Sequence, residues 1–149
     1  MELDTLYQEV ILDHYKHPLN KGLAPAYSAQ VHHINPSCGD EITLNLLSEN
    51  GLVKAITWDG LGCSISQASV SIVSDLLVNK TLDQADHIVA EFIELMHSKG
   101  TKEGNSEVLE DAVALAGVSK FPARIKCALL GWMAFKDAST RITTKSEGV

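Results

Sequence analysis

Three cysteines are the residues of this 149-residue chain best suited to chemistry. Cys38, Cys63 and Cys127 lie 25 and 64 residues apart. This spacing differs from the paired CxxC of a zinc finger, so only the fold can bring the three sulfurs together. An odd number of cysteines in a chain that shows no export signal makes a poor disulfide framework. We therefore expect thiol or metal chemistry.

Cys38 stands in a loop motif that also carries a carboxylate. Residues 36–40 read PSCGD and directly precede a predicted strand. Gly39 permits backbone geometry that turns the thiolate of Cys38 and the carboxylate of Asp40 toward one point. This motif therefore offers two candidate metal ligands.

The other two cysteines have surroundings that favour the thiolate form. Cys63 immediately precedes a predicted helix, and the positive end of the helix dipole stabilises a thiolate. Cys127 follows Arg124 by three residues on one face of the last predicted helix. A guanidinium near the sulfur has the same effect as the dipole.

Three thiolates and one carboxylate form a tetrahedral ligand set suited to zinc. Such a set carries more negative charge than the ion balances, so it calls for cationic neighbours, and Arg124 and Lys126 stand beside Cys127. Taken singly, each residue also has a structural interpretation. A cysteine can fill the core, Asp40 can close a turn, and Arg124 can be a solvated helix residue. Their joint placement favours the metal site.

Composition limits the other function classes. The chain is 45% hydrophobic and 21% charged, which is typical of one globular domain, here taken as residues 1–149. Its formal net charge of −7 excludes the basic excess of a nucleic-acid binder. No apolar run is long enough for a membrane span, and the first residues are acidic, unlike a secretory signal. We expect a cytoplasmic protein with neither a nucleic-acid nor a membrane partner.

Hydrophobic periodicity predicts one helix, then three strands, then a series of further helices. A weak strand is predicted at 27–34, and two stronger ones at 42–46 and 52–59, joined by an Asn50-Gly51 hairpin turn. Helices are predicted at 3–17, from residue 64 with a Ser64–Gln67 capping box, at 82–97, at 109–115 ending at Gly117, and from Pro122, followed by a polar tail from about 139.

Histidines and serines are weaker candidates for chemistry. The six histidines show no HxxxH-type pairing, so ordinary structural roles are expected. Five serines are predicted to form a polar helix face, and without a paired base a serine nucleophile is not supported. They are Ser64, Ser66, Ser69, Ser71 and Ser74.

Four motifs, in order, surround the predicted site: DHYK at 13–16 with Pro18, Asn20 and Gly22; PSCGD at 36–40; GLGCSISQAS at 60–69; and FPARIKC at 121–127. Together they resemble the SufU-type members of the IscU-like proteins of iron–sulfur cluster assembly. The resemblance covers residues 3 to about 136.

The resemblance implies an α+β fold, with a small antiparallel three-stranded sheet packed against helices. It implies a zinc ion held by Cys38, Asp40, Cys63 and Cys127. It also implies a sulfurtransferase that accepts persulfide sulfur from a pyridoxal-phosphate cysteine desulfurase of the SufS type and passes it toward cluster assembly. Cys38 would receive the sulfur and Arg124 would assist the exchange, which makes these two the catalytic residues.

The main alternative is an IscU-type scaffold that holds a [2Fe–2S] cluster. Such scaffolds carry a histidine directly before the last cysteine, where this chain has Lys126, and an LPPVK segment that is absent between Leu115 and Phe121. Yet three cysteines and an aspartate can also ligate iron. A zinc hydrolase ranks last, because four protein ligands leave no open position for water.

Overall fold

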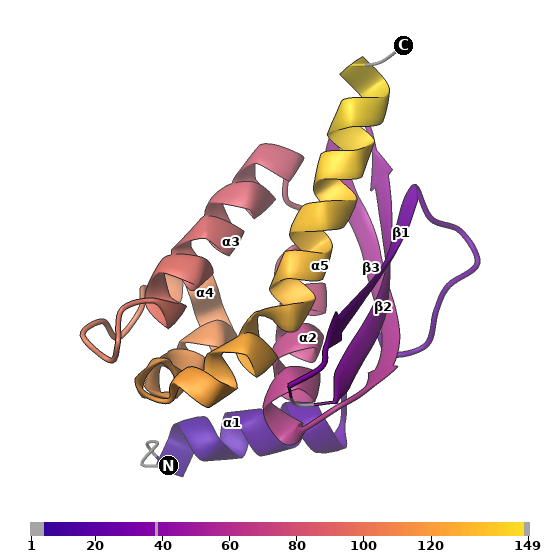
Figure 1. Ribbon diagram of the computed structural model, residues 1–149. Helices are drawn as coiled ribbons and strands as arrows, with labels where there is room; N and C mark the ends of the chain where they lie inside the picture. Colours follow the sequence, from indigo (N-terminus) through magenta and orange to yellow (C-terminus); the bar gives the residue numbers. More distant parts are fainter. Residues whose placement is uncertain (1–4, 38, 148–149) are drawn as a thin grey trace.

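The computed structural model describes residues 5–37 and 39–147. In this part of the chain a three-stranded antiparallel sheet, in the order β1-β2-β3, packs against a layer of helices (Figure 1). Helix α5 (Pro122–Glu147) lies along β1 and β2, and helix α2 (Ser64–Leu76) contacts both α5 and β3. The α+β class and the small antiparallel sheet predicted from the sequence are confirmed.

The three strands follow one another along the chain. They are β1 (Ala29–Asn35), β2 (Asp40–Glu49) and β3 (Leu52–Leu61). Asn50 and Gly51 have φ angles of 55° and 75°, and two residues with positive φ are what a type I′ hairpin turn requires. The predicted hairpin is confirmed, with strands longer than expected. At the end of the hairpin opposite the turn, the last paired residues are Glu41 and Leu61. Asp40, one residue before Glu41, therefore lies beside the segment that follows β3.

The remaining helices are α1 (Thr5–Lys16), α3 (Leu82–Met96), the single turn α4 (Ser106–Leu109) and the 3-10 helix η1 (Glu110–Lys120). The helix predicted at 109–115 is therefore wrong, because this segment passes from α4 into η1. The polar tail expected from residue 139 is helical as far as Glu147. Ala138 and Ser139 are buried, and the pairing of Asp137 with His33 of β1, at 2.8 Å, ties this part of α5 to the sheet.

Helix α2 packs against α1, α5 and β3, and four of its five serines, Ser66, Ser69, Ser71 and Ser74, are buried. The prediction of a polar helix face is therefore wrong, because the buried hydroxyls form hydrogen bonds with other protein groups inside the core. Ser69 donates to the carbonyl of Ala128 at 2.6 Å and accepts from the indole of Trp132 at 2.8 Å. Close packing makes this possible: a Cβ on Gly131 would lie 2.8 Å from the Cβ of Val70. Helix α2 thereby fixes α5 in place.

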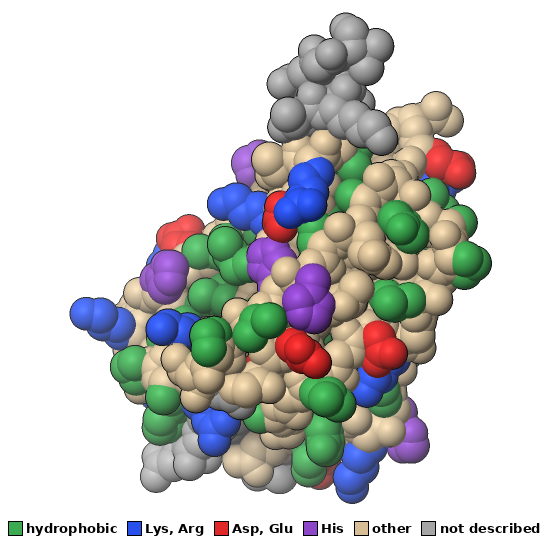
Figure 2. Space-filling model, turned by 45° about the vertical axis from the view of Figure 1, so that its right-hand side comes forward, with side chains coloured by type: hydrophobic (Ala, Val, Ile, Leu, Met, Phe, Trp, Pro, Cys, Tyr) green, Lys and Arg blue, Asp and Glu red, His purple; other side chains and the backbone are tan. Residues whose placement is uncertain are grey.

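The surface carries no large single apolar area on the face shown in Figure 2, where hydrophobic side chains lie in separate groups among polar ones. The exposed large hydrophobic residues include Ile34 and Leu61, which are 58% and 69% exposed. Across the described ranges, no helix is both long and apolar enough to cross a bilayer.

Candidate metal centre

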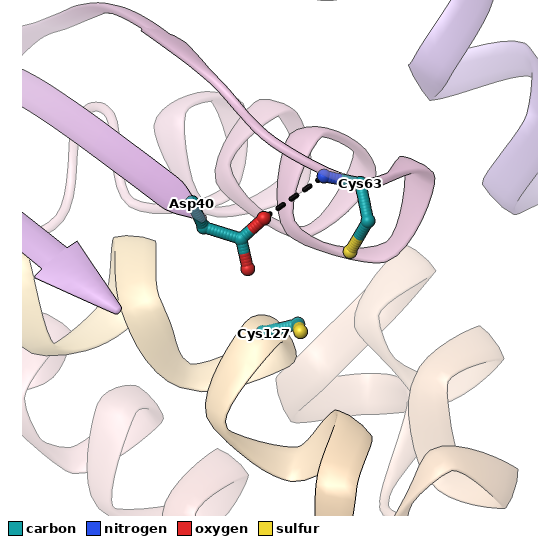
Figure 3. Close-up of side chains that lie close together, drawn as sticks. All are labelled: Asp40, Cys63 and Cys127. Atoms are coloured by element: carbon teal, nitrogen blue, oxygen red, sulfur yellow. Dashed lines mark hydrogen bonds between the residues drawn. The ribbon is translucent and has the colours of Figure 1, made fainter. Parts of the chain in front are cut away.

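Three of the predicted ligands come together where the sheet meets α2 and α5. One ligand atom from each of Asp40, Cys63 and Cys127 lies within 4.8 Å of the others. They come from the start of β2, the N-cap of α2 and the second turn of α5, and Figure 3 shows their ligand atoms facing a common space. Among the described residues no other group of three potential ligands is this close. The fold thus brings together three potential ligands that are far apart in the sequence.

The carboxylate of Asp40 is held by one oxygen, while the other is unpartnered. Oδ1 accepts a hydrogen bond from the backbone N–H of Cys63 at 2.9 Å (Figure 3). Oδ2 is buried and has no hydrogen-bond partner among the described residues, and the residue is 0% exposed. Because a buried carboxylate is costly unless it is paired or binds a metal, an orphaned oxygen beside two sulfurs indicates a cation site.

The donor set fits zinc. Two cysteine sulfurs and one carboxylate oxygen are all ligands that zinc accepts in proteins, and a fourth ligand would complete a tetrahedron. Asp40 and Cys127 are fully buried, whereas Cys63 is half-buried. The centre is therefore closest to solvent on the side of Cys63.

Gly62 leaves room for the carboxylate. A Cβ at this position would lie 2.5 Å from Oδ1 of Asp40 and 2.4 Å from Oγ of Ser66. The Ser66 hydroxyl in turn donates to the carbonyl of Cys63 at 3.0 Å. Sequence reasoning missed both residues as parts of the site. The signal that could have found Gly62 is its place directly before a predicted ligand in the GLGC motif.

The predicted capping box at Ser64–Gln67 is wrong. Cys63 is itself the N-cap of α2, and it makes no side-chain capping bond, so its sulfur is not engaged by the helix terminus. A complete capping box is found instead at α3, where Thr81 and Gln84 bond each other's backbone at 3.1 and 2.9 Å.

The other predicted site residues are placed as follows. Cys38 lies outside the described residues, whereas its neighbours Ser37 and Gly39 are exposed. Arg124 and Lys126 are exposed on the first turns of α5, near Cys127 in the chain. None of the six histidines joins the group. His14, for example, is buried and bonds Ser71 at 2.9 Å and Asp111 at 3.0 Å.

Comparison with known proteins identifies relatives over most of the chain. Residues 6–128 match the model of the NifU-like N-terminal domain. The zinc-dependent sulfurtransferase SufU of Bacillus subtilis is 44% identical over 134 residues, which cover 90% of this chain and 89% of that protein. The iron–sulfur cluster assembly scaffold protein IscU of Streptococcus pyogenes is 37% identical over 140 residues, covering 94% and 86%.

Solved structures agree with these matches. A crystal structure from Fervidobacterium islandicum, named as an iron–sulfur cluster assembly scaffold protein for the SUF system, superposes with a TM-score of 0.78 at 29% identity. The superposition covers 88% of this chain and 94% of that one. Sequence and structure therefore point to the same group of proteins.

Proposed function

Since the chain belongs to the family of NifU-like N-terminal domains, we propose that it is a zinc-dependent sulfurtransferase of iron–sulfur cluster assembly. In this proposal it accepts persulfide sulfur from a SufS-type cysteine desulfurase and passes it to a cluster-assembly complex in the cytoplasm. The observation that carries the proposal is the orphaned Oδ2 of Asp40 beside the sulfurs of Cys63 and Cys127. The 44% identity to a zinc-dependent sulfurtransferase supports it.

Asp40, Cys63, Cys127 and Cys38 would hold the zinc ion. When bound, zinc keeps thiols deprotonated at neutral pH and supplies no redox chemistry of its own. The backbone N–H of Cys63 fixes Oδ1 of Asp40, so the carboxylate would offer Oδ2 as its single ligand atom. Burial of Cys127 excludes water from that side of the centre.

Cys38 is the acceptor of sulfur in this proposal. Its thiolate attacks the outer sulfur of the persulfide on the desulfurase, a new sulfur–sulfur bond forms, and the thiolate of the desulfurase leaves. One sulfur atom moves and no net oxidation occurs. The buried Cys127, inside a helix, cannot reach a partner protein. Cys38 directly precedes Gly39, which is exposed and has a φ of 70°. Because a ligand beside an exposed glycine is easier to move than one inside a helix, Cys38 is the ligand most easily presented to a partner.

The second candidate function is a scaffold for a [2Fe–2S] cluster. The 37% identity to a scaffold protein favours it, and the same ligand set can bind iron. Lys126 counts against it, because a protonated lysine in place of the scaffold's histidine cannot bind metal.

Metal analysis and a desulfurase assay separate the two functions. We expect the purified protein to be colourless, to contain about one zinc ion per chain, and to accelerate sulfide release by a SufS-type desulfurase. A brown protein that contains iron and acid-labile sulfide, and that leaves the desulfurase rate unchanged, would show the scaffold function instead.

Arg124→Ala is expected to slow sulfur uptake roughly tenfold while zinc retention changes little. The exposed guanidinium can neutralise an anionic persulfide near Cys127 without being a ligand. Uptake is measured with radiolabelled sulfur, and zinc retention by chelator competition. Arg141→Ala is the matched control, because Arg141 is the other arginine of the chain and pairs with Asp137 farther along α5. An Arg124 variant that loses zinc but takes up sulfur normally would reverse the assignment.

A further inference from the structure

A pocket lies at the same end of α5 as the metal centre. It has a volume of about 550 Å³ and is bounded by the end of α3, the turn that follows it, the end of η1 and the start of α5. Its apolar lining is Met96, Pro122 and Ile125, and its polar lining includes His97, Lys99 and Lys120. We refer to it as the lysine pocket. It combines an apolar surface with cationic groups.

The fold holds both lysines at one turn. Lys99 and Gly100 have φ angles of 55° and 81°, and the backbone N–H of Gly100 donates to the hydroxyl of Ser119 at 2.9 Å. The stem of Lys120 lies directly on this turn, because a Cβ on Gly100 would be 2.6 Å from its Cγ. The left-handed backbone conformation of Lys99 is energetically unfavourable, and the hydrogen bond between Gly100 and Ser119 offsets this conformational cost. The two cations are therefore brought together by specific contacts.

No acidic group balances these charges within the described residues. Neither Lys99 nor Lys120 forms an ion pair there, whereas the nearby Lys102 pairs with Glu94. The described pocket lining contains no Asp or Glu, although the whole chain carries a net charge of −7. The N-terminus of the 26-residue helix α5 adds positive potential beside Pro122. The pocket is thus suited to an anionic group attached to an apolar one.

The pocket is close to the metal centre along the chain. Ile125 precedes Cys127 by two residues, a rise of about 3 Å along the helix axis. Lys99, Lys120 and Pro122 are exposed, so the pocket opens to the surface and a protruding side chain can enter. Because residues two apart on a helix point to different faces, the pocket and the candidate centre flank the start of α5. A partner with an interface of ordinary size, about 800 Å² on each side, is large enough to span both.

We propose that the lysine pocket docks an acidic segment of the cysteine desulfurase, with an apolar side chain against Met96 and Ile125 and a carboxylate between Lys99 and Lys120. This inference rests on the proposed function, which supplies the desulfurase as partner. Opposite charge at such a site mainly speeds association and fixes orientation, and salt screens it.

The double variant Lys99→Asn, Lys120→Gln tests the proposal. Asparagine tolerates positive φ better than most residues, so both charges are removed without new backbone strain. Binding of the full-length, zinc-loaded protein to a purified SufS-type desulfurase is measured by calorimetry at low and high salt. We expect Kd to rise about tenfold at low salt and the salt dependence to weaken, with unchanged zinc content.

The control is the double variant Lys16→Gln, Lys54→Gln, which removes two exposed lysines outside the pocket. It should bind within about twofold of wild type, because charge effects of distant groups are screened. If the pocket variant binds as tightly as this control, with the same salt dependence, the pocket proposal is wrong and the proposed function stands. If wild-type protein does not bind the desulfurase, both fail. Circular dichroism, and the single variant Lys120→Gln, guard against misfolding.

Discussion

Cys38→Ala is expected to abolish sulfur uptake from the cysteine desulfurase. The other two cysteines are poor substitutes: Cys127 is fully buried, and Cys63 is only half-buried but sits at the fixed N-cap of α2 and not in a loop. Uptake is measured with radiolabelled sulfur and by mass spectrometry of the chain, where wild-type protein should gain the mass of one sulfur atom and the variant none. This is the largest effect that the proposed function predicts, because the acceptor atom itself is removed.

The matched control for this experiment is Ser37→Ala, a change to the exposed neighbour in the same loop. It alters the motif but leaves every predicted ligand in place, so uptake should stay near the wild-type rate. A Cys38→Ala protein that takes up sulfur as fast as this control would show that another residue is the acceptor.

Gly62→Ala is expected to lower zinc affinity on the order of 10- to 100-fold, the usual effect of disturbing a group that orients a metal ligand. The new methyl group would lie 2.5 Å from Oδ1 of Asp40, which the N–H of Cys63 holds in place. The carboxylate must then move, and Oδ2 with it. Asp40→Ala, which removes the proposed ligand, should lower zinc affinity in the same direction. Competition with a chromogenic chelator measures the affinity.

Gly51→Ala separates zinc binding from stability. Gly51 has a φ of 75°, so alanine strains the hairpin turn by about 1–2 kcal/mol, but its methyl group would have no neighbour within 4 Å. We expect a lower melting temperature with unchanged zinc affinity. If Gly62→Ala retains zinc as well as Gly51→Ala does, Asp40 is not a ligand.

Local patterns were enough to predict the parts of the fold that depend on neighbouring residues. The Asn50-Gly51 turn is one case, because its positive φ angles follow from the residue types themselves. The grouping of Asp40 with Cys63 and Cys127 is a different case, because their closeness is observed while their role as metal ligands stays a prediction. The motif around each residue indicated a ligand, although no periodicity placed them together.

The failures concern features that tertiary packing decides. The pattern of a hydroxyl followed three residues later by Gln occurs at Ser64 and again at Thr81, but only Thr81 is an N-cap in the described structure. Ser69 reads as polar surface, yet Trp132 reaches it from α5 and satisfies it inside the core. The segment after residue 139 reads as a tail, yet it continues α5, whose buried Ser139 could not be foreseen.

The register of the β2–β3 hairpin sets the position of Asp40 in the candidate metal centre. Asp40 lies one residue beyond the pair of Glu41 with Leu61. The side of the sheet to which it points therefore depends on the number of residues between it and the turn, including the register shift at Leu47 and Ser48. Because strand side chains alternate between faces, deleting one residue from β2 would point Asp40 to the opposite side, and deleting one from β3 would displace Cys63 instead. Extra residues inserted within the turn leave this count unchanged. The hairpin therefore tolerates an inserted reporter peptide only ahead of Gly51, whose carbonyl accepts a hydrogen bond from the backbone N–H of Leu82 at 2.9 Å, whereas its strands accept no change in length.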